Sequence, residues 1–62
     1  MLTKEHIYVG SLIQCTTDLS SFNNKLAVID ELQEGYYTFW AHWIAGGYRF
    51  HGNSIEFDPV VP

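Results

Sequence analysis

Apolar and polar residues alternate most clearly over positions 36–44, where aromatic and β-branched side chains follow one another without glycine or proline. Such a run is typical of a β-strand, because these side chains fit a pleated, half-buried surface. Successive side chains of a strand point to opposite faces, so the run predicts a core face and an outer face. We expect the core face to hold Tyr37, Phe39, Ala41 and Trp43, and the outer face Tyr36, Thr38, Trp40, His42 and Ile44.

Two earlier segments also have the pattern of strands. Residues 7–15 alternate in polarity, and Gly10 within them indicates a bend or bulge in a first strand. Residues 26–32 are apolar at several consecutive positions, which indicates a second strand that is central or bulged. A helix over 24–34 is the alternative, because its apolar residues also recur at helical spacing.

The segments between and after these strands contain turn-forming residues. Residues 16–25 form a loop, with Leu19 and Phe22 as its expected inward-facing anchors. A tight turn at Glu34 and Gly35 joins the second strand to the aromatic strand as an antiparallel hairpin. The remaining predictions are a reversal at Gly46 and Gly47, a fourth strand over 48–51, a turn or 3₁₀ turn over 52–54, and a last strand over 55–57 that stops before Pro59.

Five short, mostly antiparallel strands in 62 residues predict an all-β fold. A sheet of this size exposes its edges unless it curls on itself, so we expect a small barrel. The chain is expected to form one domain over 1–62, with a flexible segment at 1–6. A core this small needs dense aromatic packing or burial against a second copy or a partner.

Composition narrows the classes of function. The formal net charge is −4, which disfavours binding to the phosphate backbone of nucleic acids. No apolar run is long enough for a membrane helix, and no secretory signal is recognisable at the N-terminus. With a single cysteine, Cys15, no internal disulfide can form, and we expect a cytoplasmic location.

Four segments of the chain resemble the small SH3-like barrel proteins of tailed bacteriophages. These segments are Val9-Gly10-Ser11-Leu12-Ile13, Ala27-Val28-Ile29, Ala41-His42-Trp43 and Ser54-Ile55-Glu56-Phe57. Ser11 stands where that family usually has aspartate, and Ala27 where it usually has glycine. The resemblance implies an SH3-like barrel of about five strands and a viral protein that acts in the host cytoplasm. Because such folds serve many purposes, it implies no particular activity.

The strongest candidate site is the outer face of the aromatic strand and the strand after it. Tyr36 and Trp40 are about 13 Å apart along a strand, so Tyr48 or Phe50 from the next strand is expected to fill the space between them. An aromatic face of this kind binds peptides or cations. The alternative is that Trp40 packs under the 16–25 loop and completes the core. The expected partner-binding residues are Tyr36, Trp40, His42, Tyr48, Arg49 and His51.

Other chemistry-bearing residues have simpler interpretations. His6, His42, His51 and Cys15 are too scattered for a zinc site, so no metal or other cofactor is expected. Cys15 at a strand end is typical of a small buried residue rather than a nucleophile.

Acid and base catalysis by the acidic residues is disfavoured, because so small a barrel has little room for a pocket. Two other interpretations remain. The acidic residues form a solvated face, or they imitate phosphates in a partner's nucleic-acid channel. The residues in question are Asp30, Glu31 and Glu34, with Glu56 and Asp58 as neighbours.

These observations favour a noncatalytic protein-binding module, a phage-encoded factor that binds and modulates a host protein. Nucleic-acid binding, with bases stacked on Trp40 and Tyr48, is the main alternative. A structural homo-oligomer or virion component is a third. We expect no enzymatic activity.

Overall fold

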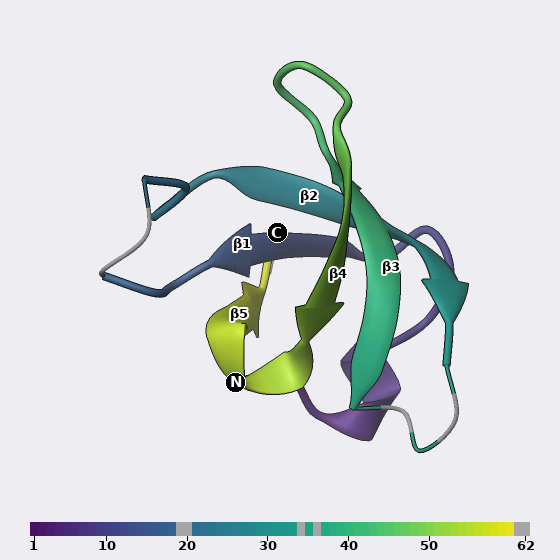
Figure 1. The fold of residues 1–62 in the computed structure, drawn as a ribbon. Helices are drawn as coiled ribbons and strands as arrows, with labels where there is room; N and C mark the ends of the chain where they lie inside the picture. Colours follow the sequence, from purple (N-terminus) through teal and green to yellow (C-terminus); the bar gives the residue numbers. More distant parts are fainter. Residues whose placement is uncertain (19–20, 34, 36, 61–62) are drawn as a thin grey trace.

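A computed structural model describes residues 1–18, 21–33, 35 and 37–60 (Figure 1). The chain forms an all-β fold with two single 3₁₀ turns. In chain order the elements are η1 (Lys4–His6), β1 (Leu12–Cys15), β2 (Leu26–Leu32), β3 (Thr38–Trp43), β4 (Arg49–Asn53), η2 (Ser54–Glu56) and β5 (Phe57–Pro59). The five strands form one antiparallel sheet in the order β4-β3-β2-β1-β5.

The predicted all-β architecture of five antiparallel strands is confirmed, and the curled sheet is consistent with a small SH3-like barrel. The sheet is not closed, because β4 and β5 are its two edges and do not pair with each other in the described part of the chain. We call the gap between these two edge strands the seam. None of the helical turns in that part of the chain has the length and apolarity needed to cross a bilayer.

The aromatic strand β3 alternates as its sequence predicts. Phe39 and Ala41 are fully buried and Trp43 is nearly so, whereas Trp40 on the other face is half-buried. The prediction for Tyr37 is wrong: it precedes β3 and is 69% exposed. Alternation places a side chain in the core only while the chain remains in the sheet, and β3 begins one residue after Tyr37.

Strand β2 has the predicted bounds, and the alternative helix over 24–34 is wrong. Its register with β3 shifts between Ile29 and Glu31, so Asp30 is the extra residue of a β-bulge. The bulge explains the missing alternation, since it lets both Ile29 and Leu32 face the core three residues apart. The β2–β3 hairpin forms as predicted, although Glu34 of its turn lies outside the described residues.

The first strand is shorter than predicted. Residues 8–10 form a turn in which the Ser11 amide donates to the Tyr8 carbonyl at 3.0 Å, and β1 begins only at Leu12. Gly10 has a φ of +94°, a conformation that side-chain-bearing residues rarely adopt. Gly10 therefore lies in the turn that precedes β1 and is not a bend within a longer strand.

The last strands are displaced relative to the prediction. Strand β4 runs two residues further than position 51, and the 3₁₀ turn predicted over 52–54 lies at Ser54–Glu56, so Ile55 and Glu56 are not strand. The Asn53 side chain accepts a hydrogen bond from the Ile55 amide at 3.0 Å and caps this turn. Strand β5 then extends to Pro59, because a proline is tolerated on an edge strand. The Gly46–Gly47 reversal is as predicted, with φ of +90° and +71°.

The N-terminal segment 1–6, expected to be flexible, packs against the barrel. Leu2 is buried, and its amide donates to the Ser54 carbonyl at 2.9 Å. The N-terminal ammonium group forms an ion pair with Asp58. The described part of this segment therefore closes the end of the barrel beside η2.

Stacked aromatic rings fill the barrel next to the seam. The Trp43 ring stacks on Phe50 at 4.3 Å and on Phe22 at 4.6 Å between centroids, and Phe50 stacks on Phe57 at 5.6 Å. Phe22 is thus an anchor of the 16–25 loop, as predicted, although it remains partly exposed; Leu19 lies outside the described residues. The tryptophan that packs against this loop is Trp43 and not Trp40.

Candidate functional site

The candidate site lies on the outer face of the sheet, away from the core. The antiparallel register places Trp40 of β3 opposite His51 of β4, and His42 opposite Arg49. In an antiparallel pair, residues directly opposite each other project to the same face. The fold therefore brings four of the predicted partner-binding residues together on one surface.

The bulge in β2 adds two carboxylates to this surface. Glu31 is the partner of Trp40 in the register, and Asp30 is the extra residue before it. Because a bulge sets two residues of one strand against one residue of its neighbour, both carboxylates lie within reach of Arg49.

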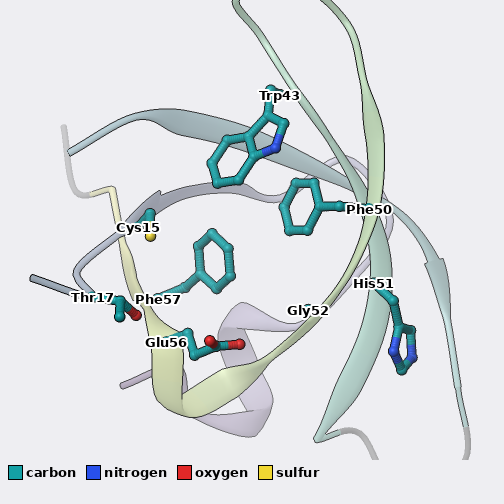
Figure 2. Close-up of a pocket in the computed structure, with 8 residues that line it drawn as sticks. All are labelled: Cys15, Thr17, Trp43, Phe50, His51, Gly52, Glu56 and Phe57. Atoms are coloured by element: carbon teal, nitrogen blue, oxygen red, sulfur yellow. The ribbon is translucent and has the colours of Figure 1, made fainter. Parts of the chain in front are cut away.

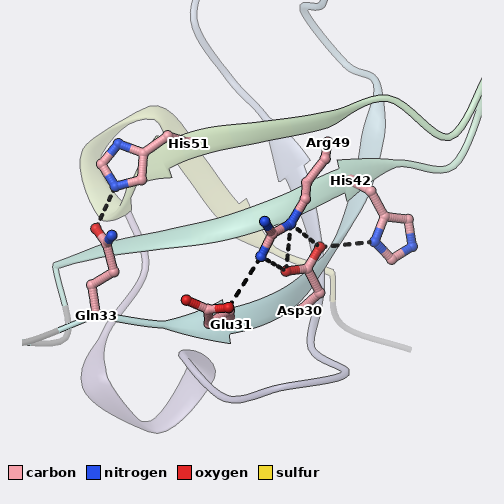
Figure 3. A network of polar contacts seen from close by, with 6 residues as sticks. All are labelled: Asp30, Glu31, Gln33, His42, Arg49 and His51. Atoms are coloured by element: carbon pink, nitrogen blue, oxygen red, sulfur yellow. Dashed lines mark hydrogen bonds and ion pairs between the residues drawn. The ribbon is translucent and has the colours of Figure 1, made fainter.

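Arg49 is held in one orientation by both carboxylates (Figure 3). Its Nε donates to Asp30 Oδ1 at 3.1 Å, and its Nη2 donates to the same oxygen at 2.9 Å and to Glu31 Oε1 at 3.3 Å. The guanidinium carbon lies 4.7 Å from the Trp40 ring centroid, within the range of a cation–π interaction. Arg49 is therefore a preordered cation stacked on an aromatic ring, with about half of its side chain still exposed to solvent.

Two histidines flank this pair. The His51 ring lies 5.0 Å from the Trp40 ring between centroids, tilted by 52°, and hydrogen-bonds to Gln33 Oε1. His42 Nδ1 lies 3.4 Å from Asp30 Oδ2. We call the surface formed by Trp40, Arg49, His42, His51, Asp30 and Glu31 the Trp40–Arg49 surface.

The other predicted site residues lie elsewhere. Tyr48 is 78% exposed in the β3–β4 hairpin, one residue before β4 begins, and Tyr36 lies outside the described residues. Phe50 points into the core, where it stacks on Trp43, so it does not extend the outer aromatic face. The adjacent strand contributes Arg49 and His51 instead, because alternation in β4 sends its odd-numbered residues outward.

The sequence prediction missed the role of Asp30 and Glu31, which it assigned to a solvated acidic face or a phosphate mimic. In the structure both carboxylates are paired with Arg49, and Asp58 is paired with the N-terminus. The signal was present in the missing alternation over 26–32, which indicates a bulge. The sequence does not show which cation lies opposite that bulge.

The ion pair shifts the protonation equilibria of both partners. Hydrogen bonding to Arg49 lowers the pKa of Asp30 below its ordinary value of 3.8, and the same hydrogen bond raises the pKa of Arg49. Burial of the Asp30 carboxyl opposes its shift, and the neighbouring His42 adds to it. Both side chains therefore remain charged throughout the neutral range.

We expect the Asp30–Arg49 pair to stabilise the fold at neutral pH and to lose that effect only in acid. A carboxyl whose pKa is lower in the folded state than in the unfolded state contributes stability above about pH 4, and the contribution disappears as the pH falls through the folded pKa. Wild type should thus be more stable than Asp30→Asn at pH 7, and the difference should shrink as the pH falls below about 4. Urea unfolding across this pH range tests the trend, with exposed Asp18→Asn as the control. An Asp30 carboxyl pKa at or above 3.8 in an NMR titration would contradict the assignment.

A small hollow opens at the seam (Figure 2), with a volume of about 150 Å³. Its apolar wall is made of Trp43, Phe50, Phe57 and Cys15, and Thr17, His51, Gly52 and Glu56 complete the lining. The wall residues are members of the core or pack against it, and their rings contact one another. Cys15 is buried here as a small core residue.

Ligands for a metal ion do not converge in the described ranges of the chain, where no group of three His, Cys, Asp or Glu side chains could hold one. His42 and His51 instead form hydrogen bonds to Asp30 and Gln33. The chemistry that the outer surface offers is therefore recognition by stacking, charge and hydrogen bonding.

No known protein-family model and no curated protein sequence matches this chain. Its function must be argued from the geometry of the Trp40–Arg49 surface.

Proposed function

We propose that this chain is a noncatalytic protein-binding module whose partner docks on the Trp40–Arg49 surface. The observation that carries the proposal is the Arg49 guanidinium, which lies 4.7 Å from the Trp40 ring centroid and is fixed by Asp30 and Glu31. Tryptophan and arginine are the residues most often found at the energetic centre of protein interfaces. Because hydrogen bonds already order Arg49, binding costs less side-chain entropy.

The charges on this surface favour a protein over a nucleic acid. Two carboxylates lie beside the one arginine, so phosphates approaching Arg49 also meet Asp30 and Glu31. The guanidinium already lies against the Trp40 ring, where a base would have to stack. Nucleic-acid binding therefore has less support than protein binding.

We further propose that the partner is a bacterial host protein and that the chain acts as a phage-encoded modulator in the host cytoplasm. The support for this part is the resemblance of four segments of the sequence to small phage barrel proteins. The Trp40–Arg49 surface is consistent with it but does not depend on it.

The test is capture of a partner from nuclease-treated bacterial lysate on immobilised protein, followed by affinity measurements on the purified partner. We expect Trp40→Ala to weaken binding by about thirtyfold, the loss of about 2 kcal/mol typical of a hot-spot residue. The matched control is Tyr37→Ala, which removes an exposed aromatic ring outside the Trp40–Arg49 surface.

Two results would contradict the proposal. One is equal binding by wild type and Trp40→Ala when circular dichroism shows both to be folded. The other is retention that depends on nucleic acid and disappears after nuclease treatment. The second result would support the nucleic-acid alternative.

A further inference from the structure

The backbone hydrogen bonds between β3 and β4 show which N–H and C=O groups of β4 point towards β3 and which point away from it. The Trp43 amide donates to the Tyr48 carbonyl and the Ser54 amide donates to the Tyr37 carbonyl, each at 2.9 Å. These bonds lie at the two ends of the β3–β4 ladder. In an antiparallel ladder, hydrogen-bonded and non-hydrogen-bonded pairs alternate, so the two bonds fix the pattern of the residues between them.

It follows that Phe50 and Gly52 direct their N–H and C=O groups towards β3. Arg49, His51 and Asn53 direct theirs away from β3, along the free edge of the sheet. This five-residue edge contains no proline or lysine, two residues that commonly protect edge strands.

The opposite edge of the sheet is protected. Strand β5 has only three residues, and the Thr16 amide donates to the Glu56 carbonyl at 3.0 Å. Alternation from that bond places the outward-facing backbone groups at Phe57 and Pro59. Proline has no N–H, so β5 offers a poor template for another strand.

The long side chains of β4 that the structure describes do not shield the edge of that strand. Arg49 extends across β3 to Asp30 and Glu31, and His51 extends to Gln33 (Figure 3). Both long side chains are thus drawn back over the sheet and away from its edge. The charge of Arg49, which could otherwise discourage strand pairing, is neutralised by its carboxylate partners.

We propose that the free edge of β4 pairs with β4 of a second copy of this chain, antiparallel about a two-fold axis at His51. The two sheets then join into one continuous sheet. The Trp40–Arg49 surfaces of both copies lie on the same side of it, which makes the dimer bivalent towards a partner.

The sequence of β4 is self-complementary in this register. Centring the pair on His51 overlaps all five residues, and it sets Arg49 against Asn53 of the second copy in hydrogen-bonded pairs. On the core-facing side it sets Phe50 against Gly52, so a large ring lies opposite a residue with no side chain. Strand β4 carries no acidic residue, and its only arginine does not face its own copy.

Shifting the axis to a neighbouring residue gives a poorer interface. A two-fold axis at Phe50 would overlap only residues 49–51 of β4, and an axis at Gly52 only residues 51–53, so each would pair fewer backbone groups than an axis at His51. Pairing of β4 with β5 of another copy would be head-to-tail and would generate a ring or an open filament, but Pro59 removes a donor from that edge.

The first test measures the oligomeric state and the hydrogen exchange of backbone amides over the same range of concentration. Light scattering from low micromolar to millimolar concentration should show a transition from monomer to dimer. Over the same range, the His51 amide should become protected from hydrogen exchange, whereas the Phe50 and Gly52 amides are protected at every concentration. A monomer throughout, a closed ring of more than two copies, or a dimer with an unprotected His51 amide would each overturn the proposal.

The second test is a matched pair of variants at one position. His51→Pro deletes the outward-facing N–H without removing a bond to β3, whereas His51→Ala removes the imidazole and keeps the N–H. We expect His51→Pro to weaken dimerisation by about tenfold or more relative to His51→Ala, because one edge bond per copy is lost. Circular dichroism establishes that both variants are folded, and equal dimerisation by the two would overturn the pairing.

This inference does not depend on the proposed function. Trp40→Ala leaves every backbone group of β4 in place, so it should weaken partner binding by about thirtyfold and leave the dimer intact. His51→Pro and His51→Ala both lack the imidazole of the Trp40–Arg49 surface, so the two variants should bind a partner with equal single-site affinity and differ only in dimerisation. The two proposals can therefore fail separately.

Discussion

Trp43→Ala is expected to destabilise the fold by about 3–5 kcal/mol, the usual cost of removing a buried tryptophan or phenylalanine ring. Trp43 is 8% exposed and contacts Phe22, Phe50 and Phe57, so its loss leaves a cavity lined by rings that cannot all collapse into it. Typical stability per residue puts a domain of this size at roughly 3–9 kcal/mol. The variant should therefore lose about half of its stability or more, and its urea midpoint, followed by circular dichroism, should fall far below that of wild type.

Trp40→Ala is the matched control for Trp43→Ala, because it removes the same side chain from the same strand on the opposite face. Trp40 is only half-buried and its contacts are with Arg49 and His51, so we expect a loss of about 1 kcal/mol, near the centre of the range for single substitutions. Equal destabilisation by the two substitutions would show that Trp40 belongs to the core and would weaken the case for the Trp40–Arg49 surface.

Gly52→Ala is expected to destabilise the fold by about 1–3 kcal/mol through overpacking. A Cβ atom at this position would lie 3.0 Å from Phe50, 3.1 Å from Phe57 and 3.2 Å from Phe39, all ring atoms of the aromatic cluster. A loss of stability would be informative, because replacing glycine by alanine at an unhindered position usually stabilises a protein by about 0.4–1 kcal/mol. Urea unfolding of the single variant measures the effect.

A second substitution separates overpacking from other causes. Phe50→Leu removes the ring atom nearest to the new Cβ, so the double variant Gly52→Ala/Phe50→Leu should be more stable than the sum of the two single losses predicts. Strictly additive losses, or a Gly52→Ala protein at least as stable as wild type, would show that the rings can yield without cost.

Side-chain alternation and turn preferences predicted a residue's position correctly wherever that position depends only on its own strand or turn. Alternation in β3 correctly separated Phe39, Ala41 and Trp43 from Trp40 and His42, and the apolar run of β2 marked that strand's bounds. Gly46 and Gly47 were recognisable as a reversal because their positive φ values are a property of the chain itself.

The errors occurred where a strand begins, ends or meets another segment. Tyr37 has the right periodicity for the core, but pairing with β4 in the strand starts only at Thr38. Ile55 and Glu56 were predicted as strand, yet the cap from Asn53 and the bond from Ser54 to Tyr37 turn the chain there. The Ser54–Tyr37 bond joins residues that are far apart in the chain, so a pattern along the sequence does not reveal it, whereas the Asn53 cap is local.

By itself the sequence determined the fold class, the two faces of the aromatic strand and most of the residues on its outer face, because side-chain alternation and turn geometry are local. Only the tertiary structure decided that a bulge places Asp30 and Glu31 around Arg49, and that Arg49 stacks on Trp40. It also decided that β4 is an edge strand that pairs only with β3 among the described strands. The physical reason is that register and sheet order depend on how all five strands bury their apolar faces together, and no single segment contains that information.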